Sequence, residues 1–264
     1  MVDEARVAIV TGSATGIGAA VAQRLASHGW HVVINYTKSE AEARTTAETC
    51  RAQGGAAETC QANVAEDGDC RRLAQCALDH WGRIDALVNN AGTTKFVAAD
   101  DLEGLSRADF EQIFAVNLVG AFQMTRAAVP ALRATGAGSV VNLSSHSGLS
   151  GQGSSVAYAA SKGALNTLTT GLARSLAPDI RVNAVCPGFV ETRWVTDRMS
   201  AADFAAFKAR AERNAPLGQM PRPDDVAEAV SWFVEGGRLV TGQLLVIDAG
   251  MHLGIGTPRP PRDG

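Results

Sequence analysis

The stretch Thr11-Gly12-Ser13-Ala14-Thr15-Gly16-Ile17-Gly18 joins a short apolar run, residues 6–11, to a segment with helical periodicity, residues 19–28. Glycine permits positive φ angles and allows a ligand to approach the backbone closely. When such a turn opens a helix, the free N–H groups and the helix dipole favour the binding of a pyrophosphate. Because the turn follows the first expected strand, the stretch predicts a dinucleotide-binding site.

Apolar runs of strand length alternate with helical patterns along the rest of the chain. Strands are expected at residues 6–11, 31–35, 57–62, 86–89, 139–143, 180–185 and 243–247, and helices at 19–28, 39–53, 67–81, 107–132, 155–176, 201–213 and 224–235. Ser39 is expected to cap the second of these helices. The predicted fold is α/β, a Rossmann-type doubly wound parallel sheet of about seven strands with helices on both faces, in a single domain over residues 1–255. Residues 256–264 carry three prolines and no apolar anchor, which predicts a mobile tail.

Composition narrows the class of protein. The chain has 264 residues, of which 46% are hydrophobic, and a net charge of −3, which argues against a nucleic-acid partner. No apolar run approaches the roughly 18 residues that span a membrane, and the polar start of the chain does not resemble a signal peptide. The five cysteines, Cys50, Cys60, Cys70, Cys76 and Cys186, include no C-x-x-C pair. They predict reduced thiols in a cytoplasmic protein without a metal site.

Four further motifs follow the glycine turn in order. They are Asn89-Asn90-Ala91-Gly92, Tyr158-Ala159-Ala160-Ser161-Lys162, Arg181-Val182-Asn183-Ala184-Val185-Cys186-Pro187-Gly188 and Thr241-Gly242. Together with the turn, they resemble the short-chain dehydrogenase/reductase family over roughly residues 6–250, including its 3-oxoacyl-carrier-protein reductase branch. The resemblance implies an oxidoreductase that interconverts a ketone or aldehyde and an alcohol by hydride transfer with a nicotinamide cofactor.

Candidate catalytic residues lie on the expected helix 155–176 and after the expected strand 139–143. Tyr158 and Lys162 share one helix face, and a nearby ammonium is expected to lower the pKa of the phenol and make it a general acid/base. Ser145 follows the strand at the sheet edge where ligands bind, and the family's spacing selects it over Ser144. The resemblance also implies that Asn117 bends its helix and holds a water, in a proton relay from Tyr158 through a ribose hydroxyl and Lys162.

The cofactor is predicted to be NADP(H), with NAD(H) as an alternative. An NAD-selective site places a carboxylate at the end of the second strand, but no acid occurs here before Glu40, and Lys38 offers a positive charge. The predicted cofactor-binding residues are Gly12, Ser13, Thr15, Gly16, Ile17, Gly18, Thr37, Lys38, Ser39, Asn63, Val64, Asn90, Ala91, Gly92, Tyr158, Lys162, Pro187, Gly188, Val190 and Thr192.

The long connection at residues 189–219 has the length of a lid over a substrate site. Phe189 and Trp194 are predicted to line an apolar pocket for a small carbonyl or alcohol substrate, and His146 and Gln152 are further candidate contacts. The resemblance, together with the small-residue faces of helices 107–132 and 155–176, predicts a homotetramer.

Three other functions are considered. A 3-oxoacyl-carrier-protein reductase is disfavoured because residues 135–138 and 178–179 lack the basic side chains of that branch, but it stays open because Arg126, Arg133 and Arg174 are close in sequence. A non-catalytic dinucleotide sensor is disfavoured by the intact Ser145, Tyr158 and Lys162. Nucleotide-sugar epimerases and dehydratases share Tyr-x-x-x-Lys, but they are usually longer than this chain.

Overall fold

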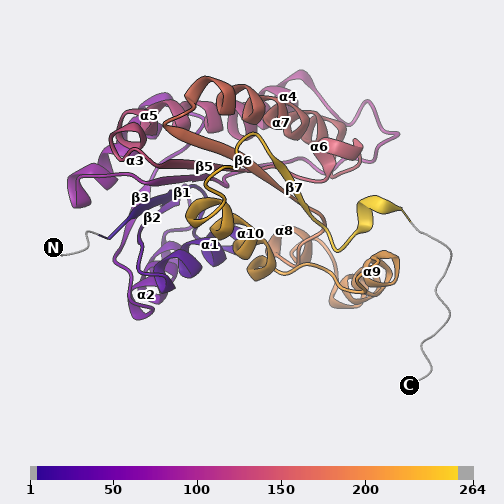
Figure 1. The fold of residues 1–264 in the computed structure, drawn as a ribbon. Helices are drawn as coiled ribbons and strands as arrows, with labels where there is room; N and C mark the ends of the chain where they lie inside the picture. The colour runs from indigo at the N-terminus through magenta and orange to yellow at the C-terminus, as the bar shows by residue number, and fades with distance from the viewer. Residues whose placement is uncertain (1–4, 255–264) are drawn as a thin grey trace.

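The core of the fold is one parallel sheet, seen in a computed structural model that describes residues 5–254. The strands are β1 (Val7–Val10), β2 (His31–Tyr36), β3 (Ala57–Gln61), β4 (Ala86–Asn89), β5 (Gly138–Leu143), β6 (Ile180–Pro187) and β7 (Leu244–Ile247). Their spatial order is β3-β2-β1-β4-β5-β6-β7, and every neighbouring pair is parallel (Figure 1). The predicted doubly wound sheet is therefore confirmed.

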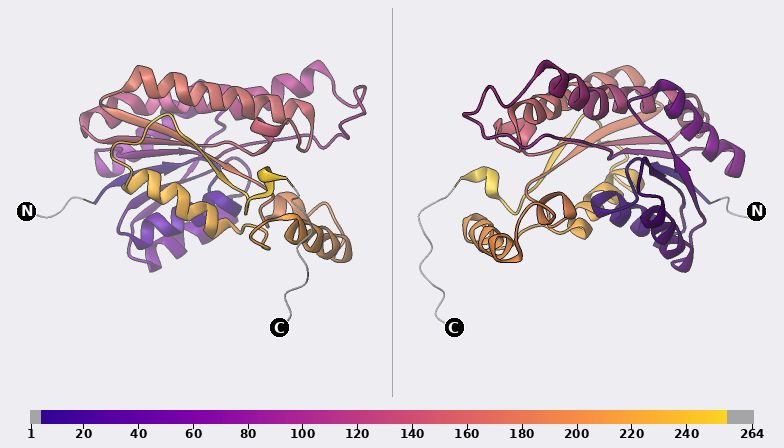
Figure 2. Two further views of the ribbon diagram at one scale, coloured as in Figure 1. Left: turned by 45° about the vertical axis from the view of Figure 1, so that its right-hand side comes forward. Right: turned by 180° about the vertical axis from the view of Figure 1, so that it is seen from behind.

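Helices cover both faces of the sheet in two layers (Figures 1 and 2). The helices are α1 (Gly16–Ser27), α2 (Glu40–Ala52), α3 (Asp67–Trp81), α4 (Arg107–Phe114), the π-helical segment η1 (Ala115–Gly120), α5 (Ala121–Ala134), α6 (Ser147–Ser150), α7 (Val156–Leu176), α8 (Arg193–Thr196), α9 (Ala201–Asn214), α10 (Pro223–Glu235) and the 3-10 turn η2 (Met251–Leu253). One layer contains α1, α2 and α10, and the other contains α3, α5 and α7.

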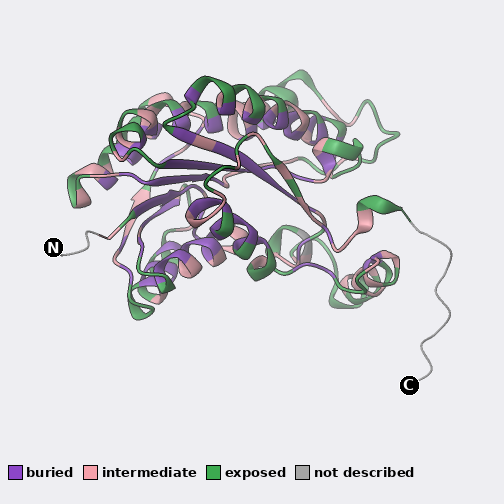
Figure 3. Cartoon of the chain, viewed as in Figure 1, coloured by how far each residue is buried: buried purple, intermediate pink, exposed green. Residues whose placement is uncertain are grey.

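Each face of the sheet has its own hydrophobic core. Ala8 and Val10 of β1 point into the layer of α1, α2 and α10, whereas Val7 and Ile9 point into the layer of α3, α5 and α7. All four side chains are fully buried, as the interior colouring in Figure 3 shows for the central strands. Burial on both faces explains why these strands are continuous apolar runs rather than alternating ones.

The structure corrects two expectations about single elements and adds three short elements. The helix expected at 107–132 contains the π segment η1 and continues to Ala134, and the short elements α6, α8 and η2 were not expected. Ser39 lies at the N-cap position of α2, but its side chain makes no capping hydrogen bond. Its backbone, with φ −91° and ψ 61°, is outside the extended region in which an N-cap hydroxyl reaches the first helical turn.

Some expectations concern features at the ends of the chain or its surroundings. The predicted domain limits, 1 and 255, and the predicted mobile tail, 256–264, lie outside the described residues. None of the helices within residues 5–254 is long and apolar enough to cross a membrane. All five cysteines are free in this structure.

Candidate active site

A cavity of about 880 Å³ lies at the carboxyl ends of the strands. It is centred where the strand order changes direction, between β1 and β4, which is where open α/β sheets bind their ligands. Its wall includes residues from the glycine turn, from the ends of β2, β4, β5 and β6, and from α7 and α8. Most of the sequence-predicted site residues therefore face one shared space.

The glycine turn is held against the segment that follows β4. Gly12 has φ +61°, and a Cβ added to Gly18 would lie 2.5 Å from Asn90 Nδ2, so neither position accepts a side chain. Asn90 Nδ2 donates to the carbonyl oxygens of Thr11 (2.8 Å) and Gly12 (3.0 Å). Ser13 and Gly18, which were predicted to bind the cofactor, do not line the cavity. Ser13 Oγ donates to the carbonyl of Val10 (2.7 Å) inside the turn, and Gly18 packs against Asn90. Gly12, Thr15, Gly16, Ile17, Asn90, Ala91 and Gly92 do line the cavity.

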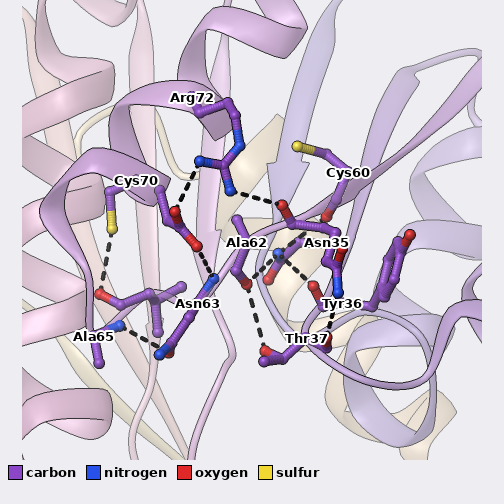
Figure 4. A network of polar contacts seen from close by, with 12 residues as sticks. Asn35, Tyr36, Thr37, Cys60, Ala62, Asn63, Ala65, Cys70 and Arg72 are labelled. Atoms are coloured by element: carbon purple, nitrogen blue, oxygen red, sulfur yellow. Dashed lines mark hydrogen bonds and ion pairs between the residues drawn. The ribbon is translucent and has the colours of Figure 1, made fainter.

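Asn35, the last residue but one of β2, makes hydrogen bonds to β3 and the segment that follows it (Figure 4), and also to the glycine turn. Its Oδ1 accepts from the N–H of Gly12 (2.9 Å), and its Nδ2 donates to the carbonyls of Cys60 (3.2 Å) and Ala62 (3.0 Å). Thr37 Oγ1 also donates to the Ala62 carbonyl (3.4 Å). This network fixes the edge of the cavity beside β2 without a carboxylate.

Lys38 contributes a positive charge at this edge of the cavity. Thr37 and Lys38 line the cavity, and Lys38 is exposed and makes no ion pair within residues 5–254. Ser39 does not line it. Asn63 and Val64 also line the cavity, and Asn63 Oδ1 accepts from the N–H of Ala65 (3.2 Å).

Ser145, Tyr158 and Lys162 come together at the centre of the cavity wall. Ser155 caps α7 by accepting from the N–H of Tyr158 (3.2 Å), which fixes the first turn of this helix. Lys162 Nζ donates to the carbonyl of Leu143 (2.7 Å) and lies 5.8 Å from the centroid of the Tyr158 ring. Ser144 Oγ instead donates to the backbone carbonyl of Lys162 (3.2 Å), as expected of a structural serine.

Burial controls the ionisation of the two groups on α7. It raises the pKa of Tyr158 to about 12, and the hydrogen bond from Ser145 opposes this only in part. Burial also lowers the pKa of Lys162 to about 8. The prediction that Lys162 lowers the pKa of Tyr158 is therefore wrong for the protein alone, because burial dominates that pKa and the ammonium points to the carbonyl of Leu143.

Asn117 is buried in η1 behind the cavity and does not line it. Its Oδ1 accepts from the N–H of Thr93 (2.8 Å), and its Nδ2 donates to Ser161 Oγ on α7 (3.0 Å). The π-helical turn around Asn117 matches the predicted irregularity in this helix. The side chain thus joins the segment after β4 to α7, and its predicted role in holding a water stays a prediction.

The part of the cavity beside β6 and α8 includes two large aromatic side chains, Phe189 and Trp194. His146, Gln152, Phe189 and Trp194 all line the cavity, as do Pro187, Gly188, Val190 and Thr192. The Trp194 ring lies 6.0 Å from the Tyr158 ring between centroids, and Phe189 packs edge-on against Phe207 of α9 at 5.0 Å.

Sequence reasoning missed several residues of this wall. Phe96, Arg193 and Met251 line the cavity but come from three segments that are distant in sequence. Phe96 follows the Asn-Asn-Ala-Gly motif by four positions, and Arg193 follows the predicted Thr192 directly, so closeness to a motif was the available signal. Met251 carries no such local signal.

Comparisons with known proteins agree with this geometry. The family model described as enoyl-(acyl carrier protein) reductase matches residues 12–252. A Streptomyces violaceoruber protein named as ketoacyl reductase 2 of the granaticin polyketide synthase is 43% identical, over 95% of this chain and 97% of its own. A 3-oxoacyl-[acyl-carrier-protein] reductase of Synechocystis is 34% identical, over 94% of this chain and 97% of its own.

A solved structure from Burkholderia xenovorans, described as a short-chain dehydrogenase/reductase, superposes with a TM-score of 0.89. It is 41% identical and covers 96% of this chain and 100% of its own. The sheet, the glycine turn and the cavity define a Rossmann-type fold, and the matching family makes the protein an oxidoreductase. The chain belongs to the short-chain dehydrogenase/reductase family.

Proposed function

We propose that the protein is an NADP(H)-dependent enzyme that interconverts ketones or aldehydes and alcohols, with Tyr158 as the general acid/base. The observation that carries this proposal is that Ser145, Tyr158 and Lys162 line the same cavity as the glycine turn. A non-catalytic sensor would need the turn but not this trio. A direct assay of dinucleotide consumption with a panel of ketones separates the two functions.

The residues at the cavity wall fit a nicotinamide dinucleotide. Gly12 and Gly16, both with positive φ, leave the backbone at the start of α1 free of side chains. A diphosphate can therefore approach the N–H groups of this turn. In this arrangement Lys38 and Thr37 would hold the adenosine ribose phosphate, Asn63 and Val64 the adenine, Lys162 the nicotinamide ribose, and the segment from Pro187 to Thr192 the nicotinamide. The bound cofactor supplies the hydride.

Side chains of the protein transfer the proton that accompanies the hydride. Ser145 lies where its hydroxyl can donate to a substrate oxygen as negative charge develops on it. The phenol of Tyr158 keeps its proton near neutral pH because its pKa is raised to about 12. It is thus in the form that donates a proton to the oxygen during carbonyl reduction. Asn117 and Lys162 lie behind it on the proposed path to solvent.

The protonation state of Tyr158 can be measured directly, because the chain has two tyrosines. In a Tyr36→Phe variant, Tyr158 is the remaining tyrosine, and its ionisation is followed by ultraviolet difference absorbance in the ligand-free protein. We expect no ionisation until the pH is well above the ordinary value of about 10, because burial raises the pKa of Tyr158 to about 12. Ionisation below the ordinary value would contradict this description of the site.

The substrate half of the cavity indicates an uncharged, apolar carbonyl compound. Phe96, Phe189 and Trp194 contribute aromatic surface, and His146 and Gln152 contribute polar groups at its edge. Asp248 also reaches the wall, but its carboxylate already accepts from His252 and from the N–H of Gly250. Aryl or other bulky apolar ketones therefore fit this wall better than charged keto acids.

Replacing Trp194 with Ala is expected to raise KM for bulky aryl ketones by about tenfold, the scale of an aromatic contact. KM for small aliphatic ketones should change little, because they do not reach the Trp194 ring. Steady-state kinetics on both substrate classes checks this, with Trp232→Ala as the matched control, since Trp232 is on α10 away from the cavity. If KM changes equally for both substrate classes, Trp194 does not form part of the proposed substrate wall.

Delivery of the substrate on an acyl carrier protein is the second candidate function. It is favoured by the names of the relatives and by Arg174, which makes no ion pair within residues 5–254, and it is opposed by the ion pairs of the other two candidate carrier contacts. Arg126 is paired with Asp67, and Arg133 lies 3.5 Å from Asp179. Comparing kcat/KM for a 3-oxoacyl thioester on a carrier protein and on a short thiol decides between the two.

We further propose a homotetramer. Val119 of η1, Phe122 of α5 and Val156 of α7 are about 40% exposed, an unusual exposure for three large apolar side chains on the predicted interface helices. Light scattering at micromolar concentration is expected to show a tetramer, and a monomer would contradict the proposal.

A further inference from the structure

The segment after β6 crosses directly over the glycine turn. Thr192 is so close to the turn that a Cβ added to Gly16 would lie 3.7 Å from Thr192 Cγ2. Arg193, the next residue and the first of α8, lines the same cavity as Gly16 and Lys38. Its side chain therefore starts above the part of the turn that is proposed to hold the diphosphate.

Arg193 reaches from this segment to α2, on the other side of the cavity. Its Nη1 and Nη2 atoms lie 3.3 Å and 3.4 Å from Glu42 Oε1, although the two residues are 151 positions apart. Glu42 is in the first turn of α2, close in the chain to Lys38. The ion pair thus spans the groove between the glycine turn and the edge proposed to bind the adenosine ribose phosphate.

The pair is well suited to exchange partners. Both side chains are about half exposed, at 54% and 42%, and exposed ion pairs contribute little to stability. Hydrogen bonds from its own backbone and from Arg193 hold the pKa of Glu42 below its ordinary value, so the carboxylate is ionised. A phosphate offers Arg193 the same bidentate geometry as a carboxylate and a larger charge.

We propose that Arg193 is a phosphate-binding residue for the dinucleotide, held by Glu42 in the free protein and transferred to a cofactor phosphate on binding. This inference rests on the proposed function. The exchange would also draw the start of α8 onto the bound cofactor, next to Trp194 and the substrate wall. The recognised group is a phosphate, either in the diphosphate beside Gly16 or on the adenosine ribose beside Lys38.

The test is a double-mutant cycle on cofactor affinity. The Kd values of NADPH and NADH are measured by protein fluorescence for wild type, Arg193→Ala, Glu42→Gln and the double variant. Glu40→Gln and Arg44→Ala are the matched controls, because this ion pair is on the same helix at 2.6 Å, is exposed and does not line the cavity. Thermal unfolding of each free variant shows that the fold is retained.

Arg193→Ala is expected to weaken NADPH binding about tenfold, the lower end of the range for a charge-assisted contact. Glu42→Gln is expected to tighten it a few-fold by freeing Arg193, and this gain should vanish in the double variant. An equal loss for NADPH and NADH assigns Arg193 to the diphosphate, and a loss confined to NADPH assigns it to the ribose phosphate.

Two results would overturn the inference while leaving the proposed function intact. One is an Arg193→Ala variant that binds both cofactors within twofold of wild type. The other is a Glu42→Gln gain that persists without Arg193, since Glu42 would then act only by repelling the phosphate. If wild type binds neither dinucleotide, the proposed function itself fails together with this inference.

Discussion

Replacing Tyr158 with Phe is expected to lower turnover by about 10²–10⁴-fold, the usual cost of losing a general acid. The substitution removes one hydroxyl from a partly buried ring and leaves its packing against Trp194 in place. The contact of Lys162 with the Leu143 carbonyl does not depend on that hydroxyl. Dinucleotide affinity and thermal stability should therefore stay close to those of wild type, while the absorbance assay of dinucleotide oxidation loses its signal.

Tyr36→Phe is the matched control, because it makes the same chemical change in the chain's other tyrosine, which is packed against the hydrophobic core rather than the cavity. Its turnover should be near that of wild type. If Tyr158→Phe turns over within tenfold of wild type with intact cofactor binding, Tyr158 is not the proton donor. A change in KM alone would instead assign Tyr158 to substrate binding.

Replacing Lys38 with Ala is expected to reduce the preference for NADPH over NADH, measured as the ratio of kcat/KM values, by at least tenfold. One charge-assisted contact contributes about 1.5–3 kcal/mol, and about 1.4 kcal/mol corresponds to tenfold. Lys38 is free to make this contact, since it lines the cavity and has no ion pair within residues 5–254. A companion variant, Thr37→Asp, places a carboxylate at the same edge and should shift the preference toward NADH.

The control for Lys38 is Lys95→Ala, because Lys95 is paired with Asp109 at 2.8 Å and does not line the cavity. Its NADPH to NADH ratio should match that of wild type. A wild-type protein that prefers NADH would contradict the cofactor assignment. If the NADPH to NADH ratio is unchanged in Lys38→Ala, the protein still prefers NADPH, but Lys38 does not cause that preference.

Local signals explain which elements could be predicted from the sequence. Helix α3 and strand β4 have the expected bounds, because Gly82, with φ +71°, ends the helix and a short apolar run forms the strand. The glycine turn and the pair Tyr158 and Lys162 could also be predicted from the sequence. The turn is one continuous stretch, and the two side chains of the pair are one helical turn apart.

Features that depend on tertiary contacts were not predicted. Phe96, Arg193 and Met251 reach the cavity only because the topology brings three separate segments to the same end of the sheet. The missing side-chain cap at Ser39 follows from a backbone conformation that its neighbours in sequence do not specify. The pKa of Tyr158 lies above its ordinary value because of burial, which depends on the whole fold.

The transfer of deuterium from the cofactor to the product tests the central claim most directly. NADPH carrying deuterium in place of its reactive hydride is incubated with the protein and a neutral aryl ketone, and the alcohol is analysed by mass spectrometry. We predict an alcohol that carries deuterium on the former carbonyl carbon with wild type, and almost none with Tyr158→Phe. A wild-type protein that binds NADPH yet transfers no deuterium to any member of a broad panel of ketones and aldehydes would contradict the assignment and favour a dinucleotide sensor.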